Sequence, residues 1–253
     1  MTQNNIAIKE LLYKMADDLL VLGHRNSEWT GIGPMLEEDI SFSSMAQDKI
    51  GQSLALYQIL HQLGESEPDT VAFTRNAPQF HNCILAEYPI GEYDFSLMRH
   101  FLFDNAELIR YEMLMQSGFE PLAKVAKKFK GELKYHKFHA DTFVMKVAQG
   151  NEDSHHRMQD SLNFTWNMAL GIFEKSPFED ELIANGLWHG EEVLQNQWIE
   201  AIKPILEKAG LYIPDTSTWK AEFGGRVGKH SQYLQPLLDE MSEVFRIDPG
   251  AEW

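Results

Sequence analysis

The chain has 253 residues, of which 22 are basic and 38 acidic, so its formal charge at neutral pH is −16. That length suffices for one large domain with its own hydrophobic core, without a disulfide or a structural metal. The acidic balance excludes nucleic acid as the main ligand, because phosphate binding requires clustered Lys and Arg. The charge fits either a solvated surface or attraction of a basic partner, and charge alone does not separate these two interpretations.

Cys83 is the single cysteine, which excludes an internal disulfide framework and a cysteine-based zinc or iron–sulfur site. The hydrophobic content of 43% and aromatic content of 11% exclude wholesale disorder. No apolar run approaches the ~20 residues of a membrane span, and the N-terminal segment lacks the basic and then apolar pattern of a secretory signal. We therefore expect a soluble, cytoplasmic protein with no membrane contact.

Helical periodicity dominates the sequence. Apolar residues recur at spacings of three and four in seven segments, at about 6–24, 35–63, 95–117, 120–149, 153–174, 187–209 and 229–246. Clusters of Gly and Pro separate these segments, and no alternating strand pattern is present. The pattern predicts an all-α bundle in one domain that spans residues 1–253. The irregular stretch 210–228 is expected to be a loop that Tyr212 and Trp219 pack onto the bundle.

Four of the predicted helices carry an apolar stripe when they are read in steps of four and three, which keeps every residue on one face. The stripe of the first helix, from Ile8 to Leu22, is entirely apolar. The other three stripes are interrupted near their middles by Lys49 and Gln52, by Asp104, and by His136.

Each interruption alone has a structural explanation, such as a residue at the edge of its stripe or a core histidine with one satisfied hydrogen bond. Together they predict a buried polar cluster of Lys49, Gln52, Asp104 and His136. An unpaired charge in a core is costly, so Lys49 requires an acid such as Asp104.

A helical bundle with central carboxylates and histidines suggests a di-iron site, which needs two acids and two Glu-x-x-His pairs. The one Glu-x-x-His pair, Glu152 and His155, lies at a predicted helix start, where a solvated and capped first turn explains it better. At the stripe positions, Lys49 and Gln52 stand where a Glu and a His are needed, and Leu133 stands three residues before His136. A lysine ammonium repels a dication and leucine cannot ligate one, so no metal is expected in this chain.

Several longer segments resemble a known family. They are QDKIGQSLALYQILHQLGESEPDTVAFTR, AEYPIGEYDFSLMRHFLFD, VAQGNEDSHHRMQDSLNFTW and GGRVGKHSQYLQPLLDEMSEVFRIDPGAEW. These segments are similar to those of the non-catalytic C subunits of bacterial phenylacetyl-CoA epoxidases, and the resemblance runs from about Asp17 to Trp253. Its most specific parts are the stretch Leu22–Trp29, the GGRVGKH turn and the terminal Pro-Gly-Ala-Glu-Trp.

The resemblance implies a ferritin-like helical bundle with additional C-terminal helices. It also implies a partner, because the catalytic subunit of that complex is a paralogous di-iron bundle that epoxidises the aromatic ring of phenylacetyl-CoA with oxygen and electrons from a reductase. This chain would then be a structural subunit of a heteromer. It would have no cofactor and no catalytic residues of its own, with the di-iron centre expected in the partner.

The metal motif of the catalytic subunit falls on positions of this chain that have mostly changed. Its second-helix Gln-Asp-Glu-x-Gly-His corresponds to Gln47–Gln52, so Lys49 and Gln52 replace two ligands. Its third-helix carboxylate matches Asp104, its fourth-helix Glu-x-x-His falls on Leu133 and His136, and its first-helix glutamate falls near Leu19. We hypothesise that a Lys49–Asp104 charge pair replaces the iron, with Gln52 and His136 completing the hydrogen bonds.

Two other functions stay open from the sequence. The chain could be a stand-alone di-iron oxygenase with unusual ligands, so enzymatic activity is not decided, or a self-associating, homodimeric ferritin-like regulatory or storage protein. The segment Gly224–His230 is glycine-rich and basic. It either holds an anion on its amides or is a tight turn that contacts the partner or its own bundle, and it lacks the Ser or Thr and the preceding strand of a P-loop.

Overall fold

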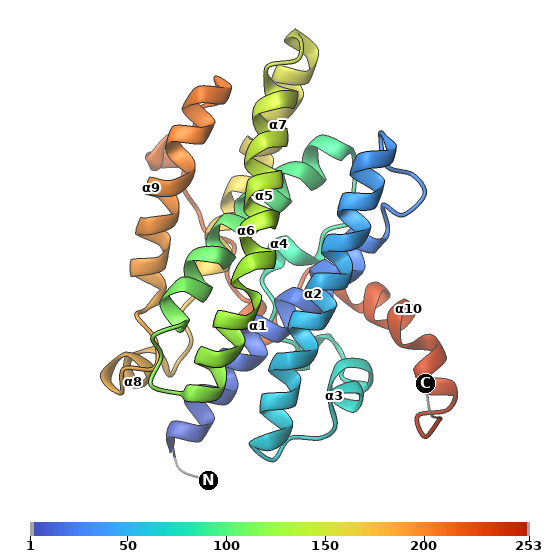
Figure 1. The fold of residues 1–253 in the computed structure, drawn as a ribbon, viewed down its shortest axis with the longest axis vertical. Helices are drawn as coiled ribbons and strands as arrows, with labels where there is room; N and C mark the ends of the chain where they lie inside the picture. Colours follow the sequence, from blue (N-terminus) through green and yellow to red (C-terminus); the bar gives the residue numbers. More distant parts are fainter. Residues whose placement is uncertain (1–2, 252–253) are drawn as a thin grey trace. The chain divides into compact units, whose positions relative to one another are not determined.

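A computed structural model describes residues 3–251 and contains helices and connecting loops (Figure 1). In that range there are ten α-helices and four short 3-10 helices, and no strand. The all-α class predicted from the sequence is confirmed. Glu252 and Trp253, the last two residues of the C-terminal motif, lie outside the described range.

The chain divides into two compact units. The first runs to Pro89 and resumes at Gly224, and the second is Ile90–Phe223. The prediction that the whole chain is one domain stays a prediction.

The first unit contains five α-helices and two 3-10 turns: α1 (Gln3–Ser27), α2 (Leu36–Gln62), α3 (Pro68–Thr74), η1 (Ala77–Gln79), α4 (Ile84–Glu87), η4 (Gly225–Val227) and α10 (Leu234–Ile247). The second unit contains the other five α-helices and two 3-10 turns: α5 (Tyr93–Leu114), α6 (Glu120–Ala148), α7 (Glu152–Leu170), η2 (Gly171–Phe173), α8 (Glu179–Ala184), α9 (Glu191–Ala209) and η3 (Thr216–Thr218). The seven predicted long helices are confirmed with shifts of a few residues at their ends. The helices α3, α4 and α8 were not predicted because four to seven residues are too few to establish a 3.6-residue period.

In the first unit, α1 and α2 form an antiparallel pair (Figure 1). The Ser53 hydroxyl donates to the Ala16 carbonyl at 2.9 Å. Toward the start of α1, Lys9 pairs with Glu65, just beyond the end of α2, at 2.5 Å. The contact is close at Gly23, where a Cβ would come within 2.7 Å of the Ile50 side chain. The apolar stripe of α1 is buried along its length, as predicted.

The C-terminal segment is anchored to α1 by a buried ion pair. The Arg226 guanidinium, 4% exposed, donates to Asp18 at 2.8 Å and to the His81 carbonyl at 2.9 Å. The glycines on either side allow this approach, because a Cβ on Gly225 would come within 2.2 Å of the Asn82 carbonyl oxygen. Gly228 has a φ of +76°, a conformation that favours glycine. The Gly224–His230 segment is therefore a tight turn on its own unit, one of the two predicted alternatives.

In the second unit, α5 is the central helix, and almost all of its residues from Phe95 to Leu114 are buried. Helix α6 runs antiparallel to it, since Glu112 of α5 pairs with Lys130 of α6 and Asn105 bonds to Asp141. On α9, the Trp198 indole donates to the Leu102 carbonyl of α5 at 2.9 Å.

The loop after α9 packs against this unit through a tryptophan. Trp219 lies on Trp166 with ring centroids 5.3 Å apart, as predicted. The prediction for Tyr212 was wrong, because its side chain is 76% exposed. The backbone of Tyr212 provides the anchor instead, since its N–H donates to the Gln159 side chain and its carbonyl accepts from the same amide.

Among the helices of residues 3–251, none combines the length and the hydrophobicity needed to cross a lipid bilayer.

Replacing Arg226 with methionine should destabilise the protein by about 3–5 kcal/mol, because it leaves the buried Asp18 carboxylate without its guanidinium. Urea denaturation followed by circular dichroism measures this loss. The matched control is Arg246→Met, at an exposed arginine of α10, which should change the unfolding free energy by less than about 0.5 kcal/mol. Equal effects of the two substitutions would contradict the structural role of the Arg226–Asp18 pair.

Candidate functional site

Helix α2 carries two of the predicted cluster residues. Lys49 and Gln52 are separated by one helical turn and therefore share a face. Both are buried, with 1% and 0% of their surface exposed. The preceding residue Asp48 is only partly buried, so the α2 face that turns inward is the one with the lysine and the amide.

The other two predicted residues lie together in the second unit. Asp104 projects from α5 and His136 from α6, with the His136 Nδ1 3.6 Å from the Asp104 Oδ1. His100 is one turn earlier on α5, and its Nδ1 is 2.5 Å from the other carboxylate oxygen of Asp104, Oδ2. All three side chains are almost completely buried. The antiparallel packing of α5 and α6 thus holds one carboxylate between two imidazoles.

A third imidazole extends this group. The His139 Nδ1 is 3.3 Å from the His100 Nε2, and its ring stacks on Phe143 with centroids 4.6 Å apart. His100 and His139 were not predicted, because neither has a glutamate three residues before it, the spacing expected of a metal-binding Glu-x-x-His pair. The available signal was the i, i+4 spacing of His100 and Asp104, which places both on one helix face.

The structure groups the four residues of the predicted cluster into two pairs. The structure brings Asp104 and His136 together in the second unit, whereas Lys49 and Gln52 share a face of α2 in the first unit. Contact between these two pairs, including the Lys49–Asp104 charge pair, stays a prediction.

The acids beside the expected first-helix ligand position have protein partners. Asp17 accepts from the Tyr57 hydroxyl at 2.5 Å and from the Arg75 guanidinium at 2.6 and 3.0 Å. Asp18 accepts from the Cys83 backbone N–H at 2.7 Å in addition to Arg226. Burial, together with the charge of Asp17, raises the pKa of Tyr57 well above its ordinary value, so the hydroxyl stays a donor to the carboxylate.

The start of α7 is a capped helix terminus. The Asn151 side chain accepts from the Ser154 backbone N–H, and the Ser154 hydroxyl accepts from the Asn151 N–H, which forms a capping box. Glu152 is exposed, and the His155 Nδ1 lies 3.0 Å from the Ala148 carbonyl oxygen. The Glu152–His155 pair therefore has the structural role expected from the sequence.

The donor set does not fit a di-iron centre. Such a centre needs four carboxylates and two histidines on facing helices, but α2 presents Lys49 and Gln52, and Leu133 stands one turn before His136. Within the described residues, no group of three or more His, Cys, Asp or Glu side chains is arranged to hold a metal ion. Among nucleophiles, Cys83 is buried, and burial together with Asp18 raises the pKa of its thiol, so it is held in the neutral form.

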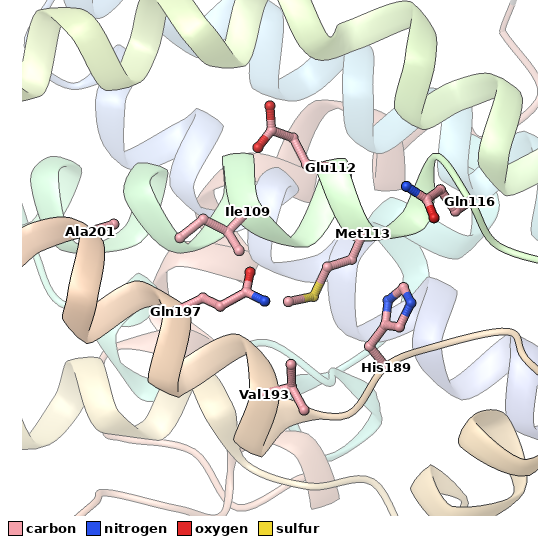
Figure 2. A pocket seen from close by; sticks show the side chains of 8 residues that line it. All are labelled: Ile109, Glu112, Met113, Gln116, His189, Val193, Gln197 and Ala201. Atoms are coloured by element: carbon pink, nitrogen blue, oxygen red, sulfur yellow. The ribbon is translucent and has the colours of Figure 1, made fainter.

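A groove between α5 and α9 of the second unit has a volume of about 430 Å³. Figure 2 shows Met113 of α5 pointing into this space toward Gln197 of α9. Glu112, the acid among the lining residues, forms an ion pair with Lys130, whose Nζ lies 3.3 Å from the Glu112 Oε1. The lining residues are Ile109, Glu112, Met113, Gln116, His189, Val193, Gln197 and Ala201. The lining combines apolar and amide side chains with one acid, Glu112, and one histidine, His189, and such a mixture suits contact with another molecule.

Comparison with known proteins identifies the family. The family model described as "Phenylacetic acid catabolic protein" matches residues 1–253. The chain belongs to this family. Its ferritin-like, all-helical fold class agrees with the structure.

Two components of one enzyme, the 1,2-phenylacetyl-CoA epoxidase of Escherichia coli K12, are among the relatives of this chain. The C subunit of that enzyme is 29% identical over 241 residues, which cover 95% of this chain and 96% of the relative. The A subunit is 23% identical over 192 residues, or 74% of this chain and 62% of the relative. Of these two, the C subunit is matched more completely and at higher identity, so the resemblance to C subunits predicted from the sequence motifs is confirmed.

Contact between Lys49 and Asp104 can be tested by a double-mutant cycle. If the two side chains pair, Lys49→Met and Asp104→Asn should each cost about 2–5 kcal/mol of unfolding free energy, and the double variant should cost at least about 1 kcal/mol less than their sum. Urea denaturation of the four proteins gives the coupling energy. As a control, Lys124→Met at an exposed lysine of α6 should add to Asp104→Asn without coupling. Additivity of the Lys49 and Asp104 substitutions would show that the two charges do not meet.

Proposed function

We propose that this chain is the non-catalytic, structural subunit of a phenylacetyl-CoA ring 1,2-epoxidase, and that it pairs with and stabilises the di-iron catalytic subunit of that enzyme. The observation that carries the proposal is a combination: the match to the C subunit of the relative covers 95% of this chain, and the helices present a donor set that does not fit two irons. A chain that retains the fold but has lost the ligands has packing surfaces to contribute and no metal chemistry of its own.

The buried charges support this role. In a di-iron bundle the cations neutralise the inward carboxylates, and removal of that charge leaves the carboxylates with a large desolvation cost. Here Asp17 and Asp18 each accept from an arginine, and Asp104 lies between two histidines. The proposal assigns to Lys49 the remaining counter-charge, with Gln52 as a hydrogen-bonding neighbour. The fold can then persist without metal, which is what a structural subunit requires.

The similarity to the A subunit of the same enzyme supports the choice of partner. This chain is related to both the A and the C subunit of one enzyme, so both relatives come from one ancestral bundle. The proposal places this chain beside a homologue of the A subunit, here called the A-type chain, in a heteromer in the cytoplasm. A CoA thioester carries phosphate charges that prevent it from crossing a bilayer, so an enzyme that acts on it is expected in the compartment that contains the thioester. The donor set argues against a stand-alone di-iron oxygenase.

Co-expression with an A-type chain tests the proposal. We expect the two proteins to elute together from a size-exclusion column in a fixed ratio, because a structural subunit must bind its partner stably. The melting temperature of the A-type chain should also rise when this chain is present, since binding to the folded state stabilises it. The control is the A-type chain expressed alone. Separate elution, with this chain as a homodimer, would favour the regulatory or storage alternative and contradict the proposal.

A further inference from the structure

Helix α2 has an exposed face without charge. Its exposed residues between Ile40 and Leu54 recur at alternating steps of four and three, and the series continues to the next turn at Gln58. We call this series the neutral face of α2; it comprises Ile40, Ser44, Gln47, Gly51, Leu54 and Gln58. All residues of α2 are described by the structure, and from Ile40 to the end of the helix none of its exposed residues is Asp, Glu, Lys or Arg; the half-buried Asp48 flanks this face.

Other exposed helix surfaces of this chain are charged. The outward side of α6 carries the exposed residues Lys124, Lys127, Lys128 and Lys134, and that of α9 carries Glu192, Glu200, Lys203 and Glu207. With 24% of the chain charged, a solvated helix of this protein normally presents ions to water. The neutral face of α2 departs from that rule. Depletion of charge is what distinguishes the core of a protein interface from the rest of a surface.

Large apolar side chains belong to the same surface. Ile40 and Leu54 are 59% and 42% exposed within the neutral face. One turn before Ile40, Leu36 is 71% exposed, and Ile32 and Met35 of the α1–α2 loop are exposed as well. These exposed apolar residues gather around the start of α2, where the exposed Glu37 also stands, so more than a single scattered hydrophobic residue is involved.

Gly51 lies at the middle of the neutral face. Glycine is a poor helix former, and a mid-helix glycine normally has a packing reason. A Cβ on Gly51 would meet no heavy atom of this chain within 4 Å, so nothing described in the protein requires glycine there. A missing side chain at the centre of an exposed helix face lets another backbone approach closely.

The spacing and the extent of the face indicate what covers it. Alternating steps of three and four form the seam along which two helices pack. The seam from Ile40 to Gln58 is about 27 Å long, and with a width of about 10 Å for one helix it buries only about 270 Å². A stable interface needs about 800 Å² per partner, so the seam is the centre of a larger contact with a folded chain and not the site of an isolated peptide.

The net charge of this chain argues against a second copy as the occupant. A second copy would bring another −16 to the interface, and that repulsion opposes association. The other available folded chain is the A-type partner, a homologue of the A subunit to which this chain is related. We propose that the neutral face of α2 docks a helix of the A-type partner, whose facing side is also uncharged and lies against Gly51. This inference rests on the proposed function and adds the contact surface to it.

Substitution of Gly51 tests the docking surface while preserving the fold. Gly51→Leu fills open space and improves helix propensity, so the isolated chain should melt at an unchanged or higher temperature. It should weaken binding to the A-type chain at least tenfold, as measured by biolayer interferometry. Gly131→Leu is the matched control, because Gly131 is also an exposed mid-helix glycine with no heavy atom within 4 Å of a Cβ, on the charged α6. The affinity of the Gly131→Leu variant for the A-type chain should stay within about twofold of that of the parent chain.

A second pair of variants tests the same surface with charge. Leu54→Glu should weaken binding at least tenfold, whereas Phe138→Glu, at a 68% exposed aromatic residue of α6, should not. If the parent chain does not bind the A-type chain at all, the proposed function fails, and the docking inference fails with it. If the parent chain binds and Gly51→Leu and Leu54→Glu bind equally well, only the docking inference is overturned. Loss of self-association with unchanged partner binding in these variants would also overturn it, because a second copy would then cover the face.

Discussion

Every charged group that these helices remove from water must meet an opposite charge or several hydrogen bonds inside the protein, because an unpaired buried ion costs several kcal/mol. This constraint determines how the first unit is assembled. Asp17 and Asp18 are adjacent on α1 and both fully buried, and they draw in two arginines from distant parts of the chain. Arg75 follows α3, and Arg226 comes from the C-terminal segment. The ion pairs therefore fasten the irregular segments onto the α1–α2 pair.

The same constraint connects the structure to the proposed function. A di-iron bundle uses its cations to neutralise buried carboxylates, whereas this chain surrounds its buried carboxylates with basic side chains. Under the proposed function, this exchange accounts for a chain that retains the helical architecture without metal chemistry of its own. The proposed structural role requires a bundle that folds without a cofactor, and ion pairs of this kind are one way to meet that requirement. The neutral face of α2 is the surface proposed for contact with the partner.

The sequence predicted the features that depend on local pattern. The long helices follow from the spacing of apolar residues, and the burial of Lys49, Gln52, Asp104 and His136 agrees with their positions in the stripes. Features that depend on contacts distant in sequence were missed. No local pattern indicates that Arg226 reaches Asp18 across 208 residues. The exposure of Tyr212 was missed for a similar reason, since its backbone finds a partner in Gln159 and the ring is not needed as an anchor.

Iron binding tests most directly whether basic side chains have replaced the metal in this chain. The purified chain is incubated with Fe(II) without oxygen and freed of excess metal, and iron content and melting temperature are then measured. An A-type chain treated identically is the control. We predict iron far below one atom per chain and an unchanged melting temperature, because the donor set cannot hold the metal. About two iron atoms per chain, as in a di-iron centre, together with a raised melting temperature, would contradict this account.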